Sequence, residues 1–146
     1  MGRHRFKVAI AAPPEVVFDL YTNVDRMHEW TGGVTGVADV SGPLTKAGAS
    51  YVVHFGRMSS PTRVIDVARP RRFLTEFGNA VLRGRNEATF EPDGAGTMMT
   101  LELRTRGPVA GLVGRIFSIG SWKGSFRGEL GRFARIAEQE MSTDHP

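Results

Sequence analysis

Few side chains in this 146-residue sequence could carry acid–base chemistry. Such chemistry needs a histidine, carboxylate or tyrosine whose pKa is shifted by a pocket. His54 is the first candidate for a general base because Val53 and Phe55 flank it, and Glu76 is the second. Strict alternation in a strand places each on the face opposite its apolar neighbours. An exposed position is therefore the alternative interpretation for both.

Three further polar residues could orient a ligand without exchanging a proton with it. Tyr21 and Tyr51 could hydrogen-bond a carbonyl group, and so could the amide of Asn86. Arg85 and Glu87 share a strand face, where an exposed ion pair is the more common arrangement. No two of these residues have a spacing that indicates a catalytic dyad.

Several kinds of site are disfavoured by composition. The sequence has no cysteine, which excludes disulfides, thiolate metal ligands and a cysteine nucleophile. It has only four histidines, two of them near the ends, so we predict neither a metal site nor a cofactor.

The chain is basic, with a formal net charge of +4 and sixteen arginines. Excess arginine can indicate binding to nucleic acid or anionic lipid. The arginines are mostly scattered along the sequence and no aromatic nucleic-acid motif accompanies them, so we favour a solvated surface and predict no nucleic-acid partner. No stretch of about 18 apolar residues predicts membrane insertion, and the first apolar run is too brief for a secretory signal. A cytoplasmic location is the expectation.

Most of the chain before residue 107 has the pattern of short strands joined by turns. Alternation and turn residues predict strands over 5–10, 34–40, 49–58, 62–68, 73–78, 82–91 and 97–106. Two prolines followed by Glu15 predict a short helix that ends near Asn23, and Asp25 could cap a second one through Trp30. About seven strands with short connections indicate an antiparallel sheet.

A long helix is predicted near the C-terminus. Helical spacing from Trp122 onward places Phe126, Leu130, Phe133 and Ala137 in one narrow apolar stripe. The apolar residues of 109–119 centre roughly 90° away, which indicates either a bend at 118–121 or a loop followed by a helix. Gly120, Gly124, Gly128 and Gly131 lie opposite the stripe, where they either are simply tolerated or form a packing face for a homodimer.

The order of these elements predicts an α+β helix-grip fold. A curved antiparallel sheet of about seven strands would wrap around the long C-terminal helix, with two short helices after the first strand. A lipocalin-like barrel would lack the early helices, and a nuclear-transport-factor-like cone would begin with helices. The length predicts a single domain over 1–146, with an ordered core of about 4–141.

Three segments resemble one known superfamily. The opening KVAIAAPPEVVFDLYTNVDRMHEW, the middle segment VIDVARPRRFLTEF and the hairpin ATFEPDGAGTMMTLEL are similar to the START-like, or SRPBCC, superfamily. Within it, they resemble the bacterial polyketide cyclase/dehydrase and lipid-transport group. The resemblance covers essentially the whole chain, but its motifs are structural, so it implies a fold and a ligand cavity without implying catalytic residues.

The cavity should lie between the sheet and the long helix. Aromatic and aliphatic side chains on a concave surface suit flat or hydrophobic ligands. Taken singly, each such aromatic side chain more often belongs to the ordinary hydrophobic core. The predicted ligand-binding residues are Met27, Trp30, Tyr51, Val53, Phe55, Asn86, Phe90, Met99, Leu101, Trp122, Phe126 and Leu130, with Leu82, Ala88 and Leu103 as further lining.

Two functions follow from such a cavity. One is binding of a hydrophobic, oxygenated small molecule with cyclisation or dehydration of a polyketide, in small-molecule biosynthesis. The other is a non-catalytic carrier or sensor of a lipid-like ligand. By resemblance to co-chaperone relatives, a protein-interaction domain is a third possibility.

Overall fold

The computed structural model describes residues 2–31, 34–55, 58–78, 83–106 and 120–143. Within these ranges it describes every side chain except those of 2, 55, 58, 120–127 and 141–143. The elements follow in the order β1 (Gly2–Ile10), α1 (Pro14–Tyr21), η1 (Val24–Glu29), β2 (Gly36–Ala38), β3 (Ser50–Phe55), β4 (Met58–Ala68), β5 (Arg72–Gly78), β6 (Arg83–Asp93), β7 (Gly96–Arg106) and α3 (Gly120–Thr143).

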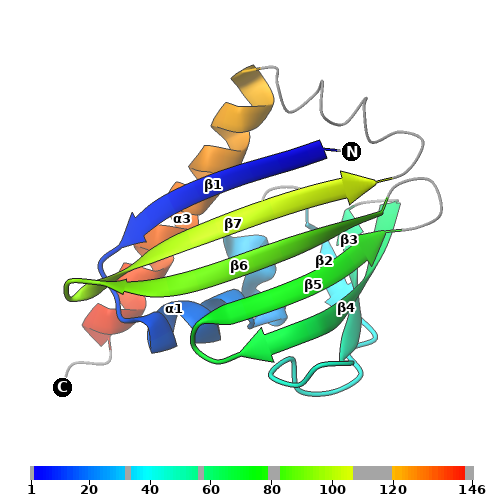
Figure 1. Cartoon of the computed structure of the whole chain (residues 1–146), viewed down its shortest axis with the longest axis horizontal. Helices are drawn as coiled ribbons and strands as arrows, with labels where there is room; N and C mark the ends of the chain where they lie inside the picture. The colour runs from blue at the N-terminus through cyan, green and yellow to red at the C-terminus, as the bar shows by residue number, and fades with distance from the viewer. Residues whose placement is uncertain (1, 32–33, 56–57, 79–82, 107–119, 144–146) are drawn as a thin grey trace.

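The strands form one antiparallel sheet in the order β1-β7-β6-β5-β4-β3-β2. Figure 1 shows that α3 and α1 lie on the same side of this sheet, which leaves its other side uncovered. We call the covered side the inner face and the uncovered side the outer face. The seven-stranded sheet, the C-terminal helix and the short helices after β1 confirm the predicted helix-grip fold.

One residue in two along each strand points to the inner face, and most of these residues are apolar. Met99 of β7 is fully buried. It lies opposite Val8 of β1 on one side and opposite the fully buried Phe90 of β6 on the other. On β5, Phe73 pairs with Ala88 and both are buried. Each large side chain buried in this way contributes about 1.5–3 kcal/mol, so the inner face is the main source of stability.

Helix α1 begins at Pro14, where a missing N–H costs no hydrogen bond, and Glu15 suits the positive end of the helix dipole. Its apolar side meets the inner face: the ring of Phe18 lies 6.2 Å from that of Phe73 and 5.6 Å from that of Phe90, both edge to face. These contacts hold α1 against β5 and β6.

Helix α3 buries Leu130, Phe133, Ala134 and Ala137, which confirms the C-terminal half of the predicted stripe. The side chains of Trp122 and Phe126 lie outside the described residues, as does most of the predicted bend at 118–121.

Polar contacts hold the C-terminal end of α3 to the segment before β2. The backbone N–H of Ala11 donates to the carboxylate of Glu138 at 2.9 Å. The guanidinium of Arg26 donates to Glu140 on α3 and to Glu29 on η1, each at 2.7 Å. The end of α3 is therefore anchored to both β1 and η1.

The Cβ of an alanine at Gly128 or Gly131 would meet no atom within 4 Å. Neither glycine is therefore required for packing within the protomer, and the homodimer stays a prediction. No helix in the described part of the chain has the length and apolar character that crossing a membrane requires.

Three local predictions were wrong. The strand predicted over 49–58 ends at Phe55, and Met58 already belongs to β4, which pairs antiparallel with β3. Residue Asn23, rather than Asp25, occupies the N-cap of η1, and it makes no side-chain capping bond. Arg85 pairs with Glu76 across the sheet instead of with Glu87, since cross-strand neighbours are closer than residues two apart on one strand.

Candidate ligand cavity

A cavity of two adjoining chambers lies on the inner face of the sheet, and α3 lines the first of them. The first chamber has a volume of about 180 Å³ and the second about 310 Å³. They share Met27, Tyr51, Thr75, Asn86 and Leu101, so one ligand could extend through both. Together they fall within the size range of small-molecule sites, roughly 300–1,000 Å³.

Among the described residues, five aromatic side chains line the first chamber, each from a different part of the fold. Trp30, just after η1, meets Phe133 of α3 edge to face with 5.0 Å between ring centroids. Tyr21, at the end of α1, also meets Phe133 edge to face, at 5.8 Å. The remaining lining comes from Met27, Thr31, Tyr51, Phe73, Thr75, Asn86, Met99, Leu101, Glu129 and Leu130.

The second chamber is lined mainly by the inner faces of β3 to β7. Tyr51 and Val53 of β3 line it together with Phe77 of β5 and Leu103 of β7. Ser60 and Thr62 of β4 add hydroxyl groups, and the hydroxyl of Thr62 already donates to the carbonyl of Ser60 at 3.3 Å. Phe6 completes the chamber from β1.

Inside this apolar surface, Tyr21 and Asn86 form a hydrogen-bonded pair. The amide Nδ2 of Asn86 donates to the Tyr21 hydroxyl oxygen at 3.0 Å. Because that oxygen is used as an acceptor, the hydroxyl hydrogen of Tyr21 remains available to donate. Burial raises the pKa of Tyr21 to about 12, and the Asn86 bond opposes this rise only in part. Tyr21 is thus a neutral hydrogen-bond donor at ordinary pH.

Tyr51 is a second hydroxyl on the same cavity. It lines both chambers and its side chain is buried. Burial raises the pKa of Tyr51, and the negative charge that an ionised Tyr21 would carry raises it further. Two neutral phenols close enough to influence each other therefore face one cavity, which suits an acceptor oxygen such as a carbonyl.

Glu129 of α3 supplies a carboxylate to the lining of the first chamber. It is partly buried and lies next to Leu130 in sequence, where the helical stripe predicts the cavity side. The sequence pattern did not predict this residue, because a carboxylate does not contribute to an apolar stripe. Across the described residues, no three histidine or acidic side chains come together in a way that could hold a metal ion.

The structure brings most of the predicted binding residues together. Those that line a chamber are Met27, Trp30, Tyr51, Val53, Asn86, Met99, Leu101 and Leu130. Phe90 lies instead in the core, where the ring of Phe18 covers it. The side chains of Phe55, Trp122 and Phe126, and all of Leu82, lie outside the described residues.

The two acid–base candidates do not line either described chamber. Glu76 is on the outer face, where its carboxylate accepts a hydrogen bond from Arg85 at 3.1 Å and its side chain is 45% exposed. His54 alternates with the buried Tyr51 and Val53, and it pairs in register with Ser59 and Gly36. Alternation was sufficient to place both away from the cavity once the inner face was known.

A family profile that covers nearly the whole sequence identifies the protein family. The profile described as polyketide cyclase / dehydrase and lipid transport matches residues 1–138. The chain belongs to this family. Membership implies binding of a hydrophobic ligand. Comparison with curated proteins finds no significant match.

Solved structures share the fold at low sequence identity. MLL2253 from Mesorhizobium loti has a TM-score of 0.74 at 15% identity, with 94% of this chain and 98% of that chain covered. NE0264 from Nitrosomonas europaea has a TM-score of 0.72 at 12% identity, covering 94% and 95%. DynU16, from the dynemicin biosynthetic locus, has a TM-score of 0.68 at 23% identity, covering 93% of this chain and 47% of that chain. At these identities the likeness establishes the fold alone.

Proposed function

We propose that this protein binds a hydrophobic small molecule with a carbonyl or similar acceptor oxygen in the cavity between the sheet and α3. The observation that carries the proposal is the pair of neutral phenols, Tyr21 and Tyr51, on an otherwise mainly apolar lining. The apolar walls would supply affinity through burial, and the hydroxyls would select for the oxygen.

The same arrangement could promote enolisation of the bound ligand. Glu129 would remove a proton from the carbon next to the carbonyl, and the electron pair would move onto the carbonyl oxygen. The hydroxyls of Tyr21 and Tyr51 would stabilise the resulting negative charge by donating to it. An enol formed in this way is the nucleophile of a carbon–carbon cyclisation, which fits the family name polyketide cyclase.

The alternative is a carrier that holds the ligand without chemistry. Its support is the position of His54 and Glu76, which are absent from the lining of the described chambers. In this version the phenols fix the ligand's orientation and Glu129 has no catalytic role.

Binding is tested with two probes of nearly equal size, 2-acetylnaphthalene and 2-ethylnaphthalene. A neutral hydrogen bond contributes about 0.5–1.5 kcal/mol, so the ketone should bind roughly 2- to 12-fold more tightly. The double variant Tyr21→Phe/Tyr51→Phe should remove this preference and leave the affinity for 2-ethylnaphthalene unchanged. His54→Gln is the matched control and should change neither affinity. Equal binding of the two probes by the unmodified protein would contradict the proposal.

Chemistry is tested by exchange of the methyl protons of 2-acetylnaphthalene in D2O, followed by NMR. The enzyme version expects the protein to accelerate exchange and Glu129→Gln to abolish the acceleration without changing the affinity. Tight binding with no acceleration would support the carrier instead.

A further inference from the structure

The outer face of the sheet gathers arginines that are scattered along the sequence. Because β1, β7, β6, β5 and β4 are neighbours, their outward residues form rows across the sheet. One row runs Arg3, Arg104, Arg85, Glu76, Arg63, each residue opposite the next. Two residues beyond Arg104 and Arg85 on the same face, Arg106 of β7 lies opposite Arg83 of β6.

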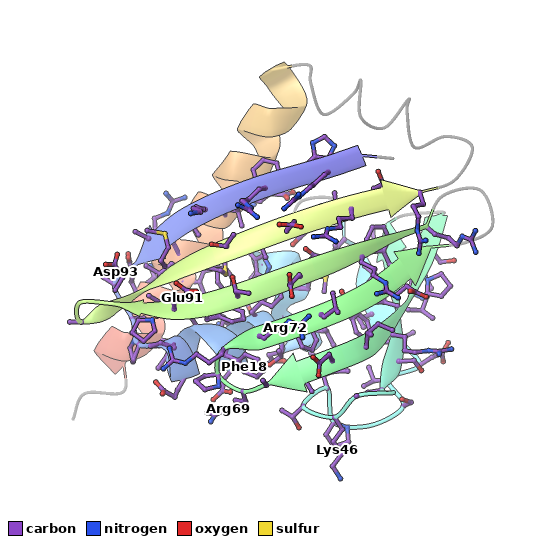
Figure 2. All side chains as sticks on the ribbon, in the orientation of Figure 1. Phe18, Lys46, Arg69, Arg72, Glu91 and Asp93 are labelled. Atoms are coloured by element: carbon purple, nitrogen blue, oxygen red, sulfur yellow. The ribbon has the colours of Figure 1, made fainter. Side chains whose placement is uncertain are left out.

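We call this set, together with Glu102, which pairs with Arg3 and Arg104, the arginine end. It contains six arginines and two glutamates, a net charge of +4: Arg3, Arg63, Arg83, Arg85, Arg104 and Arg106 with Glu76 and Glu102. The six arginines are exposed. Figure 2 shows that Glu91 and Asp93 lie toward the opposite end of β6, so positive charge gathers at one end of the outer face.

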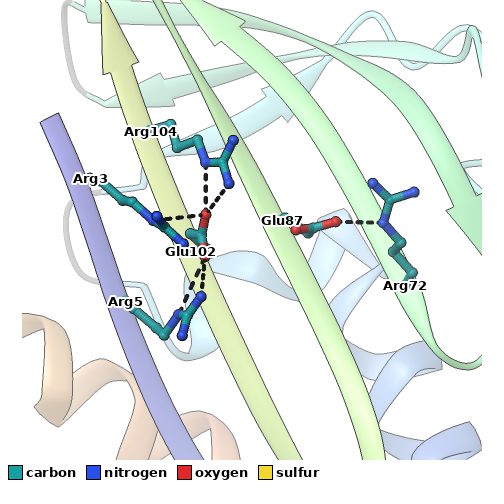
Figure 3. Close-up of polar contacts among 6 residues, drawn as sticks. All are labelled: Arg3, Arg5, Arg72, Glu87, Glu102 and Arg104. Carbon is teal, nitrogen blue, oxygen red and sulfur yellow. Dashed lines mark hydrogen bonds and ion pairs between the residues drawn. The ribbon is translucent and has the colours of Figure 1, made fainter. Parts of the chain in front are cut away.

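The carboxylates of Glu76 and Glu102 form ion pairs with only some of these arginines. Glu102 accepts from Arg3 at 3.2 Å, Arg5 at 2.8 Å and Arg104 at 2.6 Å, as Figure 3 shows, which leaves three guanidiniums around one negative charge. Glu76 accepts from Arg85. No ion pair is formed by Arg63, Arg83 or Arg106 with any described residue.

Arg83 and Arg106 are of particular interest because like charges directly opposite each other on neighbouring strands destabilise a sheet. An anion between them would turn that repulsion into attraction. Two grooves lie among the arginines of this set. One of about 230 Å³ is lined partly by Arg63, Glu76 and Arg83, and one of about 250 Å³ is lined partly by Arg85 and Arg104. The surface therefore offers exposed guanidiniums at the rims of shallow depressions.

We propose that the arginine end is a docking surface for a partner protein with an acidic surface. A guanidinium fits a carboxylate through two parallel hydrogen bonds, so these exposed arginines match acidic side chains on a partner. The described outer face has no phenylalanine, tyrosine or tryptophan on which a nucleic-acid base could stack. Among the described residues, the large apolar side chain that is exposed is Val40, which lies before β3 and outside this set. The arginines are therefore not accompanied by a described apolar side chain that could insert into a bilayer.

The test uses poly-L-glutamate of about 50 residues as the probe, labelled for fluorescence anisotropy, with the full chain. Arg83→Gln/Arg106→Gln is the test variant. Arg71→Gln/Arg135→Gln is the control, because it removes the same charge from exposed arginines outside the arginine end. We expect the test variant to bind at least tenfold more weakly and the control to stay within twofold of the unmodified protein. Equal loss in both variants would show that net charge alone governs binding and would overturn the proposal.

Two further measurements complete the test. A 20-base-pair DNA duplex and phosphatidylglycerol vesicles are titrated under the same salt conditions, and tighter binding of either one through Arg83 and Arg106 would also overturn the acidic-protein assignment. Thermal unfolding separates binding from structure: since the two arginines repel, the test variant should unfold at the same or a higher temperature. A lower temperature would show that the two arginines stabilise the fold instead of repelling each other, and would overturn the proposal.

Discussion

Glu102 offers the sharpest test of how charge is arranged on this sheet. Its carboxylate is 8% exposed and three arginines donate to it, so Glu102→Gln removes one negative charge from among three positive ones. The hydrogen bonds from Arg5, Arg104 and Arg3 lower the pKa of Glu102 from 4.5 to about 2, against the opposing effect of burial.

This pKa gives the expected size of the effect. One pKa unit corresponds to 1.36 kcal/mol, so the difference between 4.5 and 2 sets an upper limit of about 3.4 kcal/mol. The arginine side chains are 53–60% exposed, and water screens their charges. We therefore expect Glu102→Gln to lose about 1–2 kcal/mol of unfolding free energy at pH 7.

The effect also has a definite pH dependence. A carboxylate whose folded pKa lies below its unfolded pKa stabilises the protein fully above the unfolded value. That stabilisation is lost as the pH falls through the folded value. The difference between the unmodified protein and Glu102→Gln should thus be constant from pH 7 to about pH 5 and shrink between about pH 4.5 and 2.

Urea unfolding followed by circular dichroism at pH 7, 5, 3.5 and 2.5 measures this difference. Glu87→Gln is the control, because Glu87 pairs with Arg72 on the same face (Figure 3) and should lose less than about 1 kcal/mol at pH 7. A difference for Glu102→Gln that is the same at pH 7 and pH 2.5 would refute the reasoning, as would equal losses for the two variants at pH 7.

Two other predictions concern packing. Phe133 is 1% exposed and its ring meets Trp30 and Tyr21, so Phe133→Ala should lower the unfolding free energy by about 3–5 kcal/mol in urea titrations; a loss below 1 kcal/mol would mean that α3 does not pack as described. At Gly84 an added Cβ would lie 2.7 Å from the Arg104 carbonyl oxygen, so Gly84→Ala should cost about 1–3 kcal/mol. Gly36→Ala is its control in the same titrations, because an added Cβ there meets no atom within 4 Å and the cost should be much smaller.

The strands could be predicted from the sequence because alternation and turn residues are local signals. For example, β5 was predicted over 73–78 and extends over Arg72–Gly78. The separation of the predicted strand over 49–58 into β3 and β4 was missed because Gly56 and Arg57 interrupt the alternating pattern only briefly. That separation is fixed by pairing between β3 and β4, which the pattern within one strand does not contain.

The sequence by itself determined which residues share a face, since Tyr51 and Val53 must lie opposite His54 on any strand. Only the tertiary structure decided which face is inward, because that depends on the side of the sheet that α1 and α3 cover (Figure 1). The same holds for the arginine end: Arg3, Arg85 and Arg104 are far apart in the chain, and strand order and register place them in one row. Local patterns fix the direction of a side chain within its own strand, whereas its neighbours on other strands are set by pairing across long sequence separations.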